Sequence, residues 1–204
     1  MEVEKVLKNL KNGVSRDPLG YANEIFNPKV AGDDLINAIT KLVNRIKTEQ
    51  VFPQCLQDCN ISSIWKCKGA RNLFDFYRGV FRVSVFRNIL DRLIYNNEYH
   101  KVDSRLTDCN VGSRKLRNIR DHIFVLNAIL NLVTNKTEEA LDCQVYDIDK
   151  CHDSLWLHGV VNDLFDAGLT NDKLSLLFLE NSNAQVAAKS ASGISRRIPI
   201  RNII

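Results

Sequence analysis

Three carboxylates lie within seven residues of one another in this sequence: Asp147, Asp149 and Asp153. Residues 142–148 alternate polar and apolar side chains and contain the β-favouring Val and Tyr, which predicts a strand. Ser154 follows and is placed to cap a helix whose apolar residues recur at helical spacing. Asp147 would then lie at the C-terminal end of a buried strand, where rigid backbone can present its carboxylate to a hard cation such as Mg²⁺.

An acidic turn that only caps a helix is the alternative interpretation of this cluster. The spacing of Asp147, Lys150 and Asp153 resembles the motif Asp-x-x-Lys-Ala-Phe-Asp, the first catalytic palm motif of reverse transcriptases in non-LTR retrotransposons (LINE-like and jockey-like elements). The resemblance implies that Asp147 is a ligand of two catalytic magnesium ions, and that the backbone carbonyl of Ile148 also faces the metal. Lys150 and Asp153 would support this site without contacting the metal.

His152 stands where the family has an aromatic residue that packs under the sugar of the incoming nucleotide and screens out ribose. By the same resemblance His152 would contact the nucleotide, since an imidazole ring can also stack there. The departure puts nucleotide selection in doubt. Mutations accumulated in a copy of the element would also explain the histidine at this position.

Two strand-like runs, 60–66 and a second one that begins at 76, are joined by a basic turn. We predict a β-hairpin over about 60–84, whose loop could hold phosphates through cationic side chains and glycine backbone. The hairpin resembles that of the reverse transcriptase fingers. The resemblance places Lys68 over the nucleotide phosphates and Arg78 against the triphosphate or the base, with Arg71 as a further nucleic-acid contact. An ordinary exposed hairpin is the alternative.

A second basic segment, 110–121, resembles the family pattern Gln-x-Gly-Phe-Arg-x-x-Arg-Ser-x-x-Asp, with Ser113 in place of Phe. In the family this segment lies along the template strand, which implies that Arg114, Lys115 and Arg117 contact nucleic acid. Phosphate contacts of this kind do not depend on base sequence.

Charge is distributed unevenly along the chain, although the net charge is only +4. Residues 60–92 carry a net charge of +5, residues 111–123 a net +3, and residues 138–154 a net −5. A basic half facing an acidic cluster is typical of a site that holds a polyanion against metal ions. Scattered surface charge is the alternative.

Composition places the chain among globular proteins, with 45% hydrophobic and 25% charged residues in one domain or a piece of one. Six cysteines without a signal peptide indicate free thiols in a reducing compartment, so we expect a cytoplasmic or nuclear, intracellular protein. No apolar run approaches the roughly 20 residues of a membrane span, and no membrane contact is expected.

Apolar periodicity predicts six helices, at 2–10, 35–46, 85–95, 121–133, 157–165 and 172–180. Asp33 or Asp34 is placed to cap the second, and Arg87 and Asp91 fall on the polar side of the third. Residues 96–108 are polar and loop-like. Two further strands, 184–189 and 195–200, predict a hairpin. The predicted fold class is therefore α+β.

The resemblance covers nearly the whole chain, with five motifs in the family's order. It implies the fingers and partial palm of a right-hand polymerase, with a fingers hairpin and an incomplete antiparallel palm sheet. Residues 1–134 would form the N-terminal segment and fingers, and 135–204 the partial palm, without the rest of the palm or the thumb. The partners would be an RNA template, a DNA primer and deoxynucleoside triphosphates (dNTPs), and the reaction template-directed addition of deoxynucleotides to the primer.

Two-metal nucleotidyl transfer needs carboxylates from two palm motifs, and no paired-Asp motif follows the first one in this sequence. We therefore expect a fragment of an RNA-directed DNA polymerase that is inactive alone. The alternative is a non-catalytic RNA- or DNA-binding module derived from a decayed element. Two further alternatives are a working enzyme of which the given sequence is only a wrongly bounded piece, and an unstable relic without a role. The oligomeric state also remains open.

Overall fold

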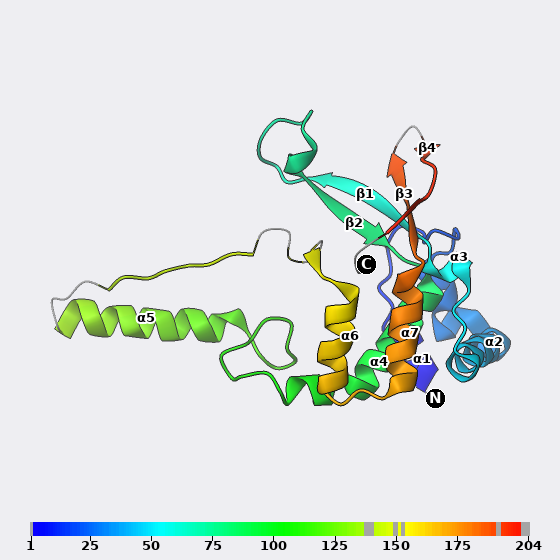
Figure 1. The fold of residues 1–204 in the computed structure, drawn as a ribbon, viewed down its shortest axis with the longest axis horizontal. Helices are drawn as coiled ribbons and strands as arrows, with labels where there is room; N and C mark the ends of the chain where they lie inside the picture. Colours follow the sequence, from blue (N-terminus) through cyan, green and yellow to red (C-terminus); the bar gives the residue numbers. More distant parts are fainter. Residues whose placement is uncertain (1, 137–140, 149–150, 152–153, 191–192, 201–204) are drawn as a thin grey trace.

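Helices and a small mixed sheet make up the chain in the computed structural model, which describes residues 2–136, 141–148, 151, 154–190 and 193–200 (Figure 1). The α-helices are α1 (Glu2–Lys8), α2 (Pro28–Glu49), α3 (Gln54–Gln57), α4 (Val85–Asp103), α5 (Ile119–Lys136), α6 (Leu157–Asp166) and α7 (Asn171–Ser182). Two short 3-10 helices are η1 (Asn23–Phe26) and η2 (Phe74–Phe76). The strands are β1 (Cys59–Trp65), β2 (Tyr77–Arg82), β3 (Gln185–Ser190), β4 (Gly193–Ile194) and β5 (Ile198–Pro199). The predicted α+β class is confirmed.

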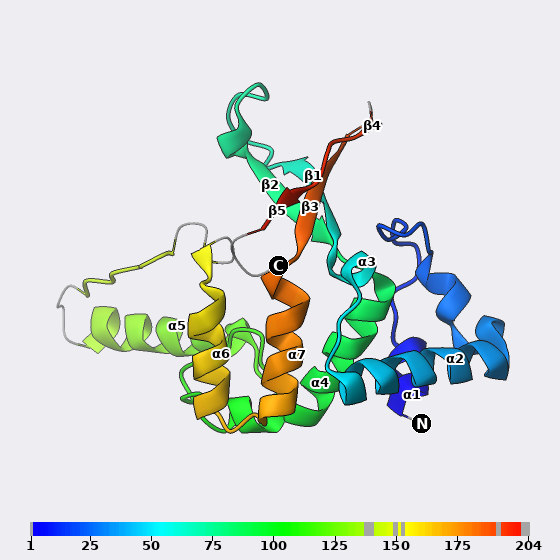
Figure 2. The same ribbon diagram turned by 45° about the vertical axis from the view of Figure 1, so that its right-hand side comes forward.

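The hydrophobic core lies where α1, α2 and α4 pack together, with α7 against them (Figure 2). The apolar stripe of α2 that the sequence predicts is buried, and so is that of α4; the fully packed members include Ile39, Val43, Ile89, Leu90 and Leu93. Each such side chain contributes about 1.5–3 kcal/mol when it leaves water. The periodicity of these two helices therefore identified the core correctly.

Helix α2 begins earlier than the sequence predicts. Asn27 caps it, because its side-chain oxygen accepts a hydrogen bond from the backbone N–H of Lys29. The helix is broken at Gly32, whose φ of 68° is a left-handed conformation that favours glycine. The regular part starts just after this break, next to Asp33, so the predicted cap position marks the kink and not the first residue of the helix.

The sheet joins two distant parts of the chain. Strands β1 and β2 form the predicted antiparallel hairpin, in a register that pairs Asn60 with Arg82 and Trp65 with Tyr77. Strand β3 then pairs with β1 in parallel and with β4 and β5 in antiparallel fashion. The predicted hairpin at 184–200 is confirmed in these short pairs. The sequence did not predict the parallel pairing that makes the sheet mixed.

Cys59 lies at the centre of this junction and is fully buried. Burial raises the pKa of its thiol to about 11, so the thiol stays protonated at neutral pH. Arg197 fixes the same junction, because its guanidinium pairs with Asp58 (Nε to Oδ2, 3.4 Å) and donates to the carbonyl of Cys59. All six cysteines are free, as the sequence predicts.

Helix α4 runs well beyond the predicted range, through residues that the sequence assigned to a loop. Pairs between neighbouring turns support the extension: Tyr99 donates to Asp103 at 2.8 Å, and Lys101 lies 2.8 Å from Glu98. The polar composition of residues 96–103 predicted a loop. The polar side chains stabilise a helix instead, because they bond to one another and to the adjacent loop.

Arg87 was predicted on the solvated side of α4, but the structure shows only 2% of it exposed. Its guanidinium donates to Asn181 on α7 at 2.8 Å and to the carbonyl of Gln57 on α3 at 3.4 Å. It also forms longer ion pairs with Asp91 (4.0 Å) and with the buried Glu180 (3.9 Å). Arg87 therefore connects three helices inside the core.

Residues 141–148 do not form the predicted strand. They run as an exposed chain without regular structure, and Val145 and Tyr146 are 87% and 86% exposed. A strand is stabilised by hydrogen bonds to a neighbouring strand, and the sheet of the described residues does not include this segment. Residues 142–148 therefore have the alternating sequence of a strand, but among the described residues no strand pairs with them.

Helix α5 is confirmed as a helix, and it projects away from the core (Figures 1 and 2). Several of its apolar side chains are exposed. Phe124 is 74% exposed and Ile123 is 52% exposed. Neither α5 nor another helix in the described ranges is long and apolar enough to cross a membrane.

Replacing Arg87 with Met should lower the free energy of unfolding by about 3–5 kcal/mol, because the Asp91–Glu180 pair would lose its buried counter-ion. Urea denaturation followed by circular dichroism measures this change. Arg45→Met on the exposed face of α2 is the matched control, since the Arg45–Glu49 pair is solvent-exposed and contributes less than about 1 kcal/mol. Equal, small losses in both variants would contradict the structural role of Arg87.

Candidate nucleic-acid interface

The loop between β1 and β2 is held in shape by its own contacts. The backbone N–H of Lys66 donates to the carbonyl of Phe76 at 2.8 Å, and its ammonium group donates to the carbonyl of Asp75 at 2.9 Å. The hydroxyl of Tyr77 donates to the carbonyl of Arg71 at 2.8 Å. Gly69 has a φ of 74° and lies against the Phe76 ring, so closely that a Cβ there would clash. The ladder and these bonds give the loop a defined shape.

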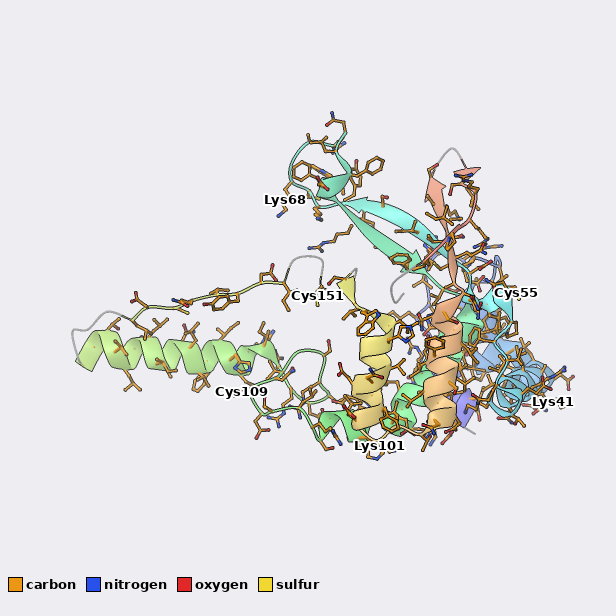
Figure 3. All side chains as sticks on the ribbon, in the orientation of Figure 1. Lys41, Cys55, Lys68, Lys101, Cys109 and Cys151 are labelled. Atoms are coloured by element: carbon orange, nitrogen blue, oxygen red, sulfur yellow. The ribbon has the colours of Figure 1, made fainter. Side chains whose placement is uncertain are left out.

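Lys68 and Arg78 are exposed on this hairpin, and Lys68 lies at its outer end (Figure 3). Within the described ranges neither side chain forms an ion pair, so both positive charges face solvent. Arg82 follows Arg78 on the same face of β2, since alternate residues of a strand share a face. Cations fixed on a rigid ladder and not neutralised can bind phosphate groups.

Arg71 lies over the ring of Trp65, with its guanidinium carbon 4.5 Å from the ring centroid. This cation–π contact fixes the plane of the guanidinium group while leaving the residue exposed. Phe74, at the start of η2 in the same loop, is 88% exposed. Exposed aromatic rings beside cations are the combination that single-stranded nucleic acids bind, through stacking and phosphate contacts together.

Gly79 stands where the resembled family usually has proline. It lies inside β2, opposite Ser63, and not in a turn. A Cβ at this position would come within 2.6 Å of Cδ1 of Ile61. Glycine therefore lets the Ile61 side chain pack across the hairpin, while the neighbouring Arg78 keeps its position.

Arg114 was predicted to contact nucleic acid, but its guanidinium is used inside the protein. It donates to Asp103 (Nε to Oδ1, 2.8 Å) and to the carbonyls of Thr107 and Asn110, and its side chain is only 7% exposed. The hydrogen bond from Arg114, and then that from Tyr99, holds the pKa of Asp103 below its ordinary value. This geometry makes Arg114 a structural clamp of the loop that follows α4.

Lys115 and Arg117 lie on the same loop and are exposed. The ammonium group of Lys115 is 4.5 Å from the centroid of the Tyr99 ring and 5.0 Å from that of Tyr95. Arg117 pairs with Asp108 at 2.7 Å, and an exposed pair of this kind contributes little and exchanges easily. Both side chains can therefore turn to a phosphate group at small cost.

The two sets of predicted contacts do not meet. The hairpin with Lys68, Arg71 and Arg78 lies above the upper ends of α6 and α7, while the loop between α4 and α5 lies at their lower ends (Figures 1 and 2). The sequence therefore located two basic surfaces, which the structure keeps apart.

Asp147 is an exposed residue in the irregular segment 141–148, and Ile148 beside it is 71% exposed. The prediction that Asp147 ends a buried strand is therefore wrong for this structure. Asp149, Lys150, His152 and Asp153 lie outside the described residues. Ser154 does not cap α6, because α6 begins at Leu157 with Trp156 at its N-cap, while the Ser154 hydroxyl donates to the carbonyl of Cys151.

The described residues do not fit the two magnesium ions that the resemblance implies. Asp147 offers a single carboxylate on a segment that no strand supports, whereas a hard cation needs several oxygen ligands on fixed backbone. Among the described residues no group of three His, Cys, Asp or Glu side chains is placed to hold a metal. We therefore derive no metal-dependent step from this geometry.

Replacing Arg114 with Ala should loosen the loop between α4 and α5 without removing an RNA contact. We expect faster amide hydrogen exchange over residues 104–118, including the N–H of Lys115, which donates to the Tyr99 hydroxyl at 2.7 Å. Mass spectrometry of exchanged peptides measures this effect. Arg117→Ala removes the same charge from the same loop and should leave exchange nearly unchanged. The reverse ranking of the two variants would contradict the clamp.

No family model matches the sequence, and the search among curated proteins finds no match.

Proposed function

We propose that this chain supplies the fingers and the start of the palm of an RNA-directed DNA polymerase of the non-LTR retrotransposon type. In this role it holds an RNA template, with its DNA primer and the incoming dNTP, and it does not add nucleotides by itself. The observation that carries the proposal is the rigid β1–β2 hairpin, which presents Lys68 and Arg78 to solvent without an ion pair among the described residues. The resemblance places Lys68 over the nucleotide phosphates and Arg78 against the triphosphate or the base.

The charge distribution supports the same role. The hairpin 59–82 carries five Lys or Arg residues and one acid, so its field attracts a polyanion at long range. Contacts to phosphates are independent of base sequence, as a polymerase requires of its template. The exposed ring of Phe74 and the stacked Arg71 add sequence-tolerant stacking surfaces next to these cations.

The proposed boundary between fingers and palm at 134–135 is not a boundary of the sheet. Strand β3, which belongs to the proposed palm half, pairs with β1 of the hairpin. The two halves therefore share one sheet, and the hairpin is anchored at its base by residues from the end of the chain. This anchoring favours a rigid phosphate-binding surface over a loose arm.

A non-catalytic RNA- or DNA-binding module is the second candidate function. The exposure of Asp147, on a segment without strand partners, favours it, because a catalytic carboxylate needs fixed geometry. The two candidates share the hairpin and differ in nucleotide binding. A polymerase fragment should bind a dNTP through Arg78, whereas a simple module should bind only the nucleic acid.

Changing Lys68 and Arg78 together to Ala should weaken binding of single-stranded RNA by about tenfold or more, because two phosphate contacts are lost. Fluorescence anisotropy with a labelled RNA at several salt concentrations measures the affinity. The slope of log K against log salt should fall by about 1.4, which is the value for two contacts on a single strand.

The double change Lys29→Ala and Lys41→Ala is the matched control, because it removes the same charge from α2, away from the hairpin (Figure 3). It should leave the affinity within about twofold. Equal losses of RNA affinity in both double variants would contradict a specific hairpin contact. They would show that the hairpin acts only through the net charge of the protein. A labelled dNTP in the same assay, with Arg78→Ala alone, separates the polymerase fragment from the simple module.

Primer extension on an RNA template with Mg²⁺ should give no product with this chain, nor with its Asp147→Asn variant. The physical reason is that two-metal transfer needs carboxylates from two palm motifs, and no paired-Asp motif follows Asp147 in this sequence. Gel analysis of a labelled primer is the measurement. Extension by the parent chain that disappears in the Asp147→Asn variant would contradict the expectation, and would show that other residues of these 204 complete the metal site.

A further inference from the structure

A cavity of about 500 Å³ lies between α4, α6, α7 and the loop that follows α4. Its walls are mainly apolar, and they include Ile94, Val160, Val161, Leu164, Leu169 and Leu177. Helix α6 contributes only apolar side chains to it. A cavity of this size matches the range of small-molecule sites, which combine an apolar lining with a few polar groups.

The polar groups of this cavity include Arg87, Asp91, Glu180 and Asn181. Glu180 is 3% exposed, and apart from the hydrogen bond that its carboxyl group shares with that of Asp91, its Oε2 has no donor among the described residues. The same is true of Oδ1 of Asp91, while Nε of Arg87 has no acceptor. Glu180 Oε1 accepts a bond from Asn181 at 3.3 Å. Buried polar atoms without partners are costly, so when both acids are ionised this end of the cavity is short of a cationic donor.

The charges point the same way. One guanidinium faces two carboxyl groups, which leaves one negative charge without a counter-ion when both acids are ionised. A proton shared by the two carboxyls is one way to neutralise it, and a cation from outside is the other. We propose that the cavity binds a small molecule with an apolar body and one protonated amine, whose ammonium group is held between Asp91 and Glu180.

The burial and closeness of the Asp91 and Glu180 carboxyl groups determine how many protons they hold. Burial first, and then the charge of Asp91, raises the pKa of Glu180 to about 9, although Arg87 opposes the shift. Burial likewise raises the pKa of Asp91. In the empty cavity the pair therefore keeps a proton at neutral pH, and an ammonium group that takes its place releases that proton. Amine binding should then strengthen as pH rises toward 9 and weaken once the amine itself loses its proton, at about 10.4 for a lysine-like amine.

The other ionisable groups around the cavity are already paired. Hydrogen bonds from Lys101 and then Lys173 hold the pKa of Glu98 low. Arg114 does the same for Asp103. The rings of Tyr95 and Tyr99 complete the wall on the α4 side, and burial raises the pKa of Tyr99. The Asp91–Glu180 pair is therefore the group that exchanges a proton with the ligand.

Isothermal titration calorimetry with naphthylmethylamine, and with the neutral naphthylmethanol as comparator, tests the proposal. We expect the amine to bind at least about tenfold more tightly than the alcohol, because it adds charged hydrogen bonds to buried acceptors. Titrations near neutral pH in two buffers of different ionisation enthalpy should show release of about one proton per amine bound. Equal affinity for both probes, or binding of the amine without proton release, would overturn the proposal.

Three variants locate the site. Glu180→Gln keeps the shape but removes the charge, and it should abolish the preference for the amine. Leu164→Trp fills the cavity from α6 and should weaken both probes. Glu49→Gln removes an exposed acid from α2 and should change neither affinity. If Glu180→Gln fails to fold, the Leu164→Trp variant and the proton count still decide. Amine binding that is unchanged by Leu164→Trp places it elsewhere and refutes the site.

Discussion

The buried guanidinium of Arg87 is the interaction on which the arrangement of the helices depends. It is the only charged group that joins α4, α7 and the end of α3 within the described part of the chain, and it does so with only 2% of its surface exposed. A buried charge of this kind tolerates little rearrangement, because moving any partner leaves an unpaired ion in an apolar medium. The helices are therefore fixed relative to one another by electrostatics as well as by apolar packing. The base of the sheet is attached to this group through Gln57, just before β1.

Arginine serves three different purposes in this molecule, which sequence alone could not separate. Arg87 is a core residue, Arg114 clamps a loop, and Arg78 faces solvent on a strand. The distinction depends on the acceptors within reach of each guanidinium group. Arg114 sits eleven residues after Asp103, and only the turn of the loop brings the two together. A motif match in the sequence assigns the same role to every arginine that it covers. The groups around each guanidinium in the structure show that the roles differ.

The elements that the sequence predicts correctly are those whose apolar or alternating pattern depends only on residues close together in the chain. The stripes of α2 and α4 and the β1–β2 hairpin are each determined within about twenty residues, and each was predicted correctly. Residues 142–148 have an equally clear alternating pattern, but a strand also needs a neighbour to receive its hydrogen bonds, and that condition is not local. The burial of Arg87 escaped prediction for the same reason, because its partners Asn181 and Glu180 are far away in sequence. For the candidate site, the sequence proposed Lys68 and Arg78, which the structure shows to be exposed, but it could not show which arginines bind other groups of the protein.

The parallel pairing of β1 with β3 has a consequence for how the chain folds during synthesis. Cys59 pairs with Val186, so the chain must be made through Val186 before the sheet can close. Ribosomes add about 5–20 residues each second, so the hairpin waits for roughly ten seconds with one edge uncovered. Pairings this distant in sequence also slow folding, because the entropy of closing the intervening chain must be lost first. The nascent hairpin is thus the segment most in need of a chaperone, and a ribosome that stalls between β2 and β3 would leave it open to pairing with other chains.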